Sequence, residues 1–153
     1  MAFNILWVDD NIEELRSHVM YLGEKGYTIS GVTNGQDALA ILRERNFDGI
    51  LLDVPCSNTG VLRRRPDARW RFDPDRLGKT AALQRALLNR MAALLTPGGR
   101  MVYSTCSLEP EENEEQIAQW LQEHPEFTQR ESRSCFPPES QTDGAFAVAI
   151  ERI

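Results

Sequence analysis

The chain lacks any apolar run long enough to cross a membrane, and we expect no secretory leader. No stretch approaches the roughly 20 apolar residues that a membrane-spanning helix needs, and no basic segment precedes the short apolar start at residues 5–8. Cysteine is scarce: Cys56, Cys106 and Cys135 are odd in number and far apart, without the spacing of metal ligands. We therefore expect a cytoplasmic protein with reduced thiols and no membrane partner.

Positive charge is also scarce in the chain as a whole. Lysine and arginine total 17 against 23 acidic residues, a net charge of −6, which argues against a dedicated nucleic-acid-binding module, because such modules usually carry a basic face. The charge is uneven, however, since residues 61–79 hold seven bases and three acids. This segment is the candidate for weak, salt-dependent contact with RNA phosphates, and the alternative is a solvated loop. Its candidate contacts are Arg63, Arg64, Arg65, Arg69 and Arg71.

A regular alternation of strand and helix patterns fills the rest of the chain. Short runs rich in apolar residues predict strands at residues 3–8, 27–32, 47–52, 101–105, 127–133 and 145–153. Helical spacing of apolar residues predicts helices at residues 12–26, 34–42, 80–95 and 111–124, with a long connection at residues 54–77. This alternation implies one three-layer α/β domain over residues 1–153, with a doubly wound, mostly parallel sheet and an antiparallel final pair of strands.

Residues 3–53 resemble the first half of a response-regulator receiver domain, which has a flavodoxin-like fold. The matching segments are residues 5–10, the Gly26-Tyr27 turn, residues 33–39 and residues 48–53. In that family the residue at the position of Asp53 accepts a phosphoryl group. Asp9 and Asp10 end one predicted strand and Asp53 ends another, so the three carboxylates would meet at the carboxyl edge of the sheet. They would suit Mg²⁺, which prefers oxygen ligands, and the alternative is three solvated carboxylates.

The receiver resemblance does not extend to a complete phosphorylation site. The family needs a lysine at the end of its last parallel strand, and neither Lys25 nor Lys79, the two lysines of this chain, ends a predicted strand. A phosphoacceptor role of Asp53 is therefore expected to be vestigial. A receiver-like domain that binds Mg²⁺ and is phosphorylated is kept as one alternative function.

Residues 47–153 resemble the second half of RNA cytosine-5 methyltransferases of the bacterial rRNA and eukaryotic NSUN type. The segments that carry this resemblance are residues 52–64, 95–99, 102–107, 109–114 and 143–146. The resemblance implies that Cys106 is the thiolate that adds to C6 of cytosine, that Cys56 assists release of the enzyme, and that Asp53 holds the edge of the base. It also implies that the arginines between residues 63 and 71 contact RNA. A free thiol with a pKa near 8.5 is mostly protonated at neutral pH, so such a site must also lower the pKa of its nucleophile.

The first half of the chain does not show the cofactor-binding pattern that the methyltransferase resemblance would require. The family binds S-adenosylmethionine on a glycine-rich loop after its first strand, and here no glycine precedes Gly23. Asp9 and Asp10 stand where the carboxylate of the cofactor would have to fit. We therefore expect that the S-adenosylmethionine site is lost and that Cys56 and Cys106 are inert thiols.

The two resemblances meet within residues 47–54, at a strand that occupies the same place in both families' sheets. Joining the two known topologies predicts the strand order 2-1-3-4-6-5, with the last strand antiparallel. The sequence thus indicates an engineered chimera, a scaffold of fragments 1–53 and 54–153 without catalytic activity. It would require no partner and would be a monomer, with a dimer as the alternative. The other alternative function is residual binding of RNA or S-adenosylmethionine by a methyltransferase-like domain.

Overall fold

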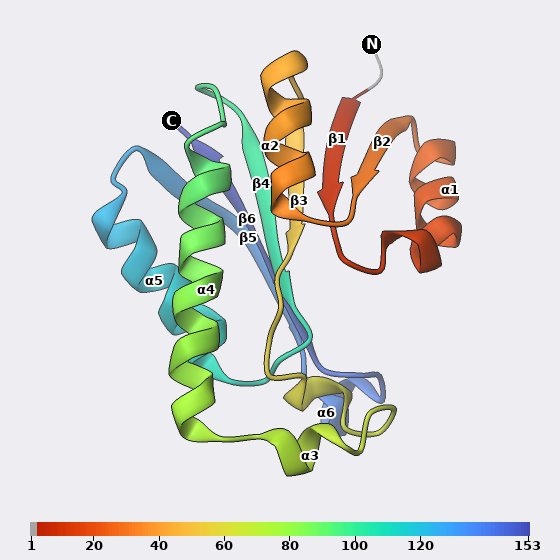
Figure 1. Ribbon diagram of the computed structural model, residues 1–153, viewed down its shortest axis with the longest axis vertical. Coiled ribbons are helices and arrows are strands. Elements are labelled where there is room, and N and C mark those ends of the chain that lie inside the picture. Colours follow the sequence, from red (N-terminus) through yellow and green to blue (C-terminus); the bar gives the residue numbers. More distant parts are fainter. Residues whose placement is uncertain (1–2) are drawn as a thin grey trace.

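The computed structural model describes residues 3–153 and contains a six-stranded sheet with the order β2-β1-β3-β4-β6-β5 (Figure 1). Parallel pairing joins β1, β2, β3 and β4, while β6 runs antiparallel to both of its neighbours. The predicted strand order and the antiparallel last strand are confirmed. The strands are β1 (Phe3–Val8), β2 (Tyr27–Val32), β3 (Gly49–Asp53), β4 (Arg100–Thr105), β5 (Phe127–Cys135) and β6 (Ala145–Arg152).

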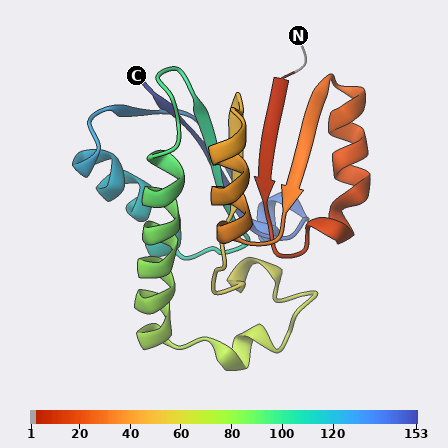
Figure 2. The same ribbon diagram turned by 45° about the horizontal axis from the view of Figure 1, so that its top comes forward.

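The helices α2, α4 and α5 lie along one face of this sheet, and α1 lies beside the edge strand β2 (Figures 1 and 2). Alternate strand residues such as Leu6, Ile50 and Met101 are buried in the core on the side of α4 and α5, where Leu88 and Trp120 meet them. No residue of α1 is buried. The helices are α1 (Arg16–Glu24), α2 (Gly35–Glu44), α3 (Ala68–Arg71), α4 (Pro74–Ala92), α5 (Glu114–Glu123) and α6 (Pro137–Ser140), with 3-10 turns η1 (Ile12–Leu15), η2 (Thr59–Val61) and η3 (Pro110–Glu112).

Capping residues explain where the long helices begin. The side chain of Asp73 accepts the backbone N–H of Asp75, and Pro74 takes the first position of the helix, where its missing N–H costs nothing. As a result α4 begins six residues before the predicted start at Thr80. The predicted helix at 111–124 instead divides at Asn113, whose non-helical backbone (φ −117°, ψ −110°) separates η3 from α5.

Three loops meet at the carboxyl edge of β3 and β4. The Gly60 N–H donates to the Cys106 carbonyl oxygen at 3.0 Å, and the Gly144 N–H donates to the Gly60 carbonyl oxygen at 2.7 Å. A side chain at Gly60 would place its Cβ 2.4 Å from the Gly144 oxygen, so the close approach requires glycine. The pairing of β3 with β4 and these loop contacts bring the segments that contain Cys56 and Cys106 together.

Within residues 3–153, no helix combines the length and the apolar character that crossing a bilayer requires.

Candidate active site

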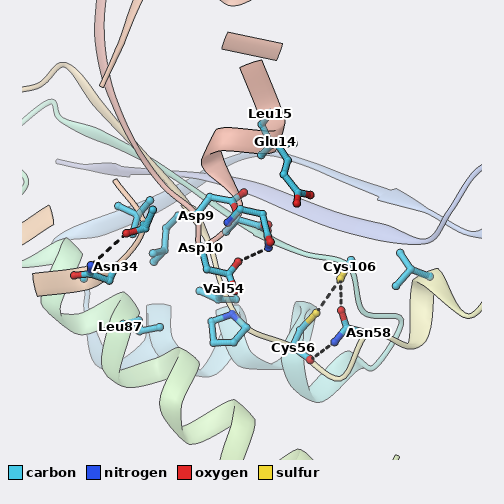
Figure 3. A pocket seen from close by; sticks show the side chains of 18 of the residues that line it. Asp9, Asp10, Glu14, Leu15, Asn34, Val54, Cys56, Asn58, Leu87 and Cys106 are labelled. Carbon is cyan, nitrogen blue, oxygen red and sulfur yellow. Dashed lines mark hydrogen bonds between the residues drawn. The ribbon is translucent and has the colours of Figure 1, made fainter. Parts of the chain in front are cut away.

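A cavity of about 560 Å³ opens at the carboxyl edge of β1, β2 and β3 (Figure 3). The chain reverses direction across the sheet between β1 and β3, and ligands of open α/β sheets bind at such a reversal. One end of the cavity is lined by the loop after β1 and the end of β2, and the other by the loops after β3 and β4. Among its lining residues are Asp9, Asp10, Thr33, Asn34, Asp53, Cys56, Asn58, Arg65 and Cys106.

Two thiols face each other at one end of the cavity. The Sγ atoms of Cys56 and Cys106 are 3.3 Å apart, and both cysteines are half-buried. Asn58 links them, because its Oδ1 accepts the Cys106 thiol at 3.1 Å and its Nδ2 donates to the Cys56 carbonyl oxygen at 2.9 Å (Figure 3). Asn58 has a left-handed backbone (φ 61°), a conformation that asparagine tolerates better than most residues. Cys135 is exposed.

The contact between the two thiols makes them chemically unequal. A hydrogen bond from the Cys56 thiol lowers the pKa of Cys106, against the opposing effects of its burial and the Asp53 carboxylate. The same hydrogen bond, together with burial, raises the pKa of Cys56 far above its usual range. Because the thiolate is the nucleophilic form of cysteine, these opposite directions favour a thiolate on Cys106 beside a protonated Cys56.

Asp53 projects into the same cavity from the end of β3. Partial withdrawal from bulk water raises the pKa of its carboxyl to about 6, and the charges of Asp9 and Asp10 act in the same direction. The Ser104 hydroxyl opposes this by donating to Asp53 Oδ1 at 2.8 Å, across the paired strands β3 and β4. Asp53 is therefore poised to exchange a proton near neutral pH while one of its oxygens is held in place.

A buried polar network lies behind the two cysteines, and sequence reasoning missed it. Glu112 is fully buried, and its carboxylate accepts the Ser57 N–H at 2.9 Å and the Ser57 hydroxyl at 2.6 Å. The Ser57 hydroxyl also lies 3.0 Å from that of Ser107. Residues 109–114 carried part of the methyltransferase resemblance, but no composition signal separates Glu112 from its acidic neighbours there.

The five predicted RNA-binding arginines do not form one patch. Arg63 and Arg64 pair with Asp143 at 3.8 Å and 2.7 Å, and Arg71 pairs with Asp67. Arg69 is exposed on α3, whereas Arg65 lines the main cavity. A second cavity of about 280 Å³ adjoins the Cys56 loop on its other side and is lined by Arg65, Arg71, Arg76 and Phe72 among others. Contact with RNA through these arginines stays a prediction.

The three carboxylates expected to hold Mg²⁺ line one cavity but do not form a metal site. Asp9 Oδ1 accepts the Asn11 N–H at 2.8 Å, and Asp10 Oδ1 accepts the Asn11 side-chain amide at 2.6 Å. Asp53 accepts Ser104. Over residues 3–153, no group of three or more histidine, cysteine, aspartate or glutamate residues is arranged to hold a metal ion. Mg²⁺ binding by Asp9, Asp10 and Asp53 finds no support in this arrangement and stays a prediction.

The chain matches a family model described as 16S rRNA methyltransferase RsmB/F over residues 8–150. It is similar to the ribosomal RNA small subunit methyltransferase B of Erwinia tasmaniensis, with 45% identity over 106 residues that cover 69% of this chain and 24% of that protein. The chain thus spans about a quarter of the length of this curated relative.

Two solved structures share the fold. A methyltransferase homologue from Pyrococcus horikoshii is 28% identical with a TM-score of 0.68, and the match covers 99% of this chain and 53% of that one. NSun6 from Pyrococcus horikoshii, crystallised with SFG, is 25% identical with a TM-score of 0.72, and the match covers 97% of this chain and 41% of that one. The fold is therefore Rossmann-like, of the methyltransferase type, and the flavodoxin-like hybrid assignment is not supported.

The interpretation of the chain as an engineered chimera with a receiver fragment is wrong. The family model runs through the supposed junction at residues 47–54 and includes nearly all of the receiver-like segment. The physical reason for the error is that receiver domains and methyltransferases share the alternation of strands and helices and the reversal of strand order beside the first strand, so a short local likeness does not separate them. The non-enzymatic scaffold and the phosphorylatable receiver domain are overturned by the same finding.

The expectation that the cofactor site is lost is also wrong, because a related structure that matches nearly the whole chain was obtained with SFG. The cavity itself fits S-adenosylmethionine: its volume lies in the usual range for sites of small organic ligands. Asp9, Asp10 and Asn34 at its far end offer acceptors for ribose hydroxyls and for a cationic ligand. The first strand meets this end through Asp9-Asp10-Asn11 instead of a glycine-rich turn, so absence of glycine did not indicate absence of a site.

Proposed function

The chain belongs to the RsmB/F family of 16S rRNA methyltransferases, and from this premise we propose that it takes part in methylation of C5 of cytosine in RNA. The single observation that carries the proposal is the thiol pair, in which Cys56 and Cys106 lie 3.3 Å apart in a cavity that also contains Asp53. Nucleophilic addition needs an activated thiolate, and release of the product needs a proton acceptor or donor beside it.

Cys106 begins the proposed reaction, as its place in the methyltransferase motif implies, and the lowered pKa of its thiol supports this. Its thiolate forms a bond to C6 of cytosine, and the electron pair of the C5–C6 double bond moves to C5, which then takes the methyl group. S-adenosylmethionine, when bound, supplies that methyl group. Cys56 assists release as the base: after its own proton has passed to bulk water it takes the C5 proton, the C5–C6 double bond is restored, and the Cys106 thiolate leaves C6.

Asp53 would hold the edge of the base during the addition. A carboxyl with a pKa of about 6 can donate a proton toward N3 of cytosine as charge develops there, or accept from the exocyclic amine. Ser104 fixes one carboxyl oxygen and leaves the other for the base. Asp9, Asp10, Thr33 and Asn34 would hold the cofactor at the other end of the cavity.

RNA is the proposed partner, and the second cavity supports this. Arg65 lines both cavities, and Arg76 lines the second beside Phe72. Guanidinium groups bind phosphates, and an aromatic ring provides a surface for stacking an unpaired base. For RNA binding, the local positive charge around Cys56 then matters more than the negative net charge of the chain.

Transfer of a radiolabelled methyl group from S-adenosylmethionine to a 16S rRNA transcript tests the proposed function. We expect Cys106→Ala to lower the transfer rate by at least about 100-fold, because the nucleophile is lost. Cys135→Ala is the matched control, since that thiol is exposed and lies outside both cavities, and it should leave the rate unchanged. Equal loss in both variants, or transfer that survives in Cys106→Ala, would contradict the assignment.

A further inference from the structure

Glu112 has a buried carboxyl group that the proposed chemistry does not use. It is 0% exposed, and within residues 3–153 no lysine, arginine or histidine forms an ion pair with it. Burial of a carboxylate without a cation is costly unless hydrogen bonds replace the lost water. The donors of those hydrogen bonds show which segments of the chain Glu112 holds together.

Every donor to the Glu112 side chain comes from another segment of the chain. Ser57 donates its N–H to Oε1 at 2.9 Å and its hydroxyl to Oε2 at 2.6 Å. Gln84 of α4 donates to Oε1 at 3.0 Å, and the same amide donates to the Pro55 carbonyl oxygen at 2.8 Å. Glu112 and Gln84 therefore hold Pro55 and Ser57, the residues on either side of Cys56, by hydrogen bonds that do not involve the Cys56 sulfur.

The same network reaches the loop of the other cysteine. The Ser57 and Ser107 hydroxyls lie 3.0 Å apart, and Ser107 directly follows Cys106. Asn113, next to Glu112, donates to the Ser107 carbonyl oxygen at 2.9 Å. One short buried segment, Glu112-Asn113, thus fixes the residues that follow each of the two cysteines.

We propose that Glu112 is the positioning residue that sets Cys56 at its working distance from Cys106, so that the enzyme is released from the methylated base. This inference rests on the proposed function for its catalytic consequence. A carboxylate is required because it offers only acceptors to three convergent N–H and O–H donors, whereas an amide would turn an N–H₂ group toward one of them. Displacement of the Cys56 loop leaves Cys106 able to attack and impairs release.

The sharpest variant is Glu112→Gln, which keeps the size of the side chain and changes only its charge and one acceptor. Its matched control is Glu111→Gln, which makes the same substitution at the preceding, exposed residue of the same 3-10 turn. The readout is the amount of covalent protein–RNA complex that survives denaturing electrophoresis during methylation of a 16S rRNA transcript.

We expect Glu112→Gln, like Cys56→Ser, to accumulate this complex at least about 10-fold above wild type, because both variants would lose assisted release. Cys106→Ser should form no complex, and Glu111→Gln should match wild type. A purely structural role of Glu112 would lower formation of the complex together with turnover, and that result would overturn the proposal.

A second measurement reads the distance between the thiols without any catalysis. Phenylarsine oxide bridges two adjacent thiols: two As–S bonds form, and the oxide oxygen leaves as water with both thiol protons. Mass spectrometry should show one bridged arsenical on wild type and on Glu111→Gln, none on Cys56→Ser, and at least about 10-fold weaker bridging on Glu112→Gln. Wild-type bridging in folded Glu112→Gln would overturn the positioning role.

Ser57→Ala covers the case in which Glu112→Gln does not fold. It removes the hydroxyl bonds to Glu112 and Ser107 but keeps the backbone N–H bond to Glu112. It should shift both readouts in the same direction by a smaller factor, and wild-type behaviour of this variant would count against the proposal. If wild type bridges the arsenical but neither methylates nor captures RNA, the proposed function fails while the geometric claim survives.

Discussion

Asp53 has a carboxyl whose protonation is coupled to the stability of the fold. Its pKa is about 6 in the folded chain against an ordinary value of 3.8, so folding favours the protonated form. The stability that this residue contributes is therefore fully present below about pH 3.8 and is lost as the pH rises through about 6. Ionisation of Asp53 near neutral pH therefore lowers the free energy of unfolding, as is common for a group placed for proton transfer.

Chemical denaturation between pH 4 and 8 measures this coupling. The free energy of unfolding of wild type, minus that of Asp53→Asn, should fall between about pH 4 and pH 7 and then level off. When the same difference is measured in proteins that also carry Ser104→Ala, it should continue to fall to a higher pH. The reason is that the hydroxyl that lowers the pKa of Asp53 is gone. Parallel pH profiles for wild type and Asp53→Asn would show that the carboxyl is not perturbed.

The sequence suggested the candidate catalytic groups of the site, whereas the contacts that hold these groups are seen only in the structure. Cys56, Cys106 and Asp53 follow strands that end at one edge, and their motif carried a specific resemblance. Asn58 and Glu112 also lie in segments that carried the resemblance, but their roles could not be inferred from it, since these depend on contacts across 48 and 55 positions of the chain. Such contacts follow from the pairing of β3 with β4, which no local pattern contains.

At the scale of elements, the loops after β3, after β4 and before β6 form one packed unit around Gly60. A Cβ atom at Gly60 would meet backbone oxygens of Gly144 at 2.4 Å and of Cys106 at 2.8 Å, so no side-chain motion can make room. Relief requires a shift of backbone in at least two loops. The site is therefore more sensitive to added volume here than at an ordinary loop glycine.

Gly60→Ala should lower the free energy of unfolding by about 1–3 kcal/mol, as overpacking does. Gly78→Ala in α4 is the matched control, because nothing lies within 4 Å of its added Cβ and alanine favours a helix. It should raise the free energy of unfolding by up to about 1 kcal/mol. Urea denaturation of both variants checks the pair, and a neutral Gly60→Ala would contradict the packing of the three loops.

Element types were predictable because each strand or helix shows its own periodicity, while several boundaries were not. The start of α4 at Pro74 depends on a cap by Asp73 inside a segment that reads as a polar loop. The break between η3 and α5 arises because Asn113 bonds to Thr105 and Ser107. Tertiary hydrogen bonds overrode a continuous helical pattern there.

For the whole molecule, the cavity explains why the two halves of the sequence were mistaken for unrelated fragments. Its far end is lined by acidic and polar residues after β1 and β2, and its near end by the thiols after β3 and β4. The first half therefore contributes carboxylates and the second half contributes thiols. The acidic first half was interpreted without the second half, as a receiver fragment. The strand order was nevertheless predicted correctly, because the receiver and the methyltransferase interpretations both place the third strand of this chain beside the first.

Because both halves line one cavity, a ligand that fills it should stabilise the domain as a unit. Binding to the folded state alone adds about 2.7 kcal/mol to the free energy of unfolding at a ligand concentration 100 times the dissociation constant. We expect S-adenosylmethionine to raise the midpoint of thermal unfolding, followed by circular dichroism, in a concentration-dependent manner. Thr33→Trp, which adds a large side chain to the cavity wall at the end of β2, should abolish the rise.

Thr28→Trp is the matched control, since it makes the same change at an exposed residue of β2 that lies outside the cavity. Its midpoint should still rise with S-adenosylmethionine as that of wild type does. A cofactor held only by the thiol end would stabilise Thr33→Trp and Thr28→Trp equally. A difference between them therefore requires that the first half of the chain bind the cofactor, and no rise in wild type would contradict the proposed cofactor site.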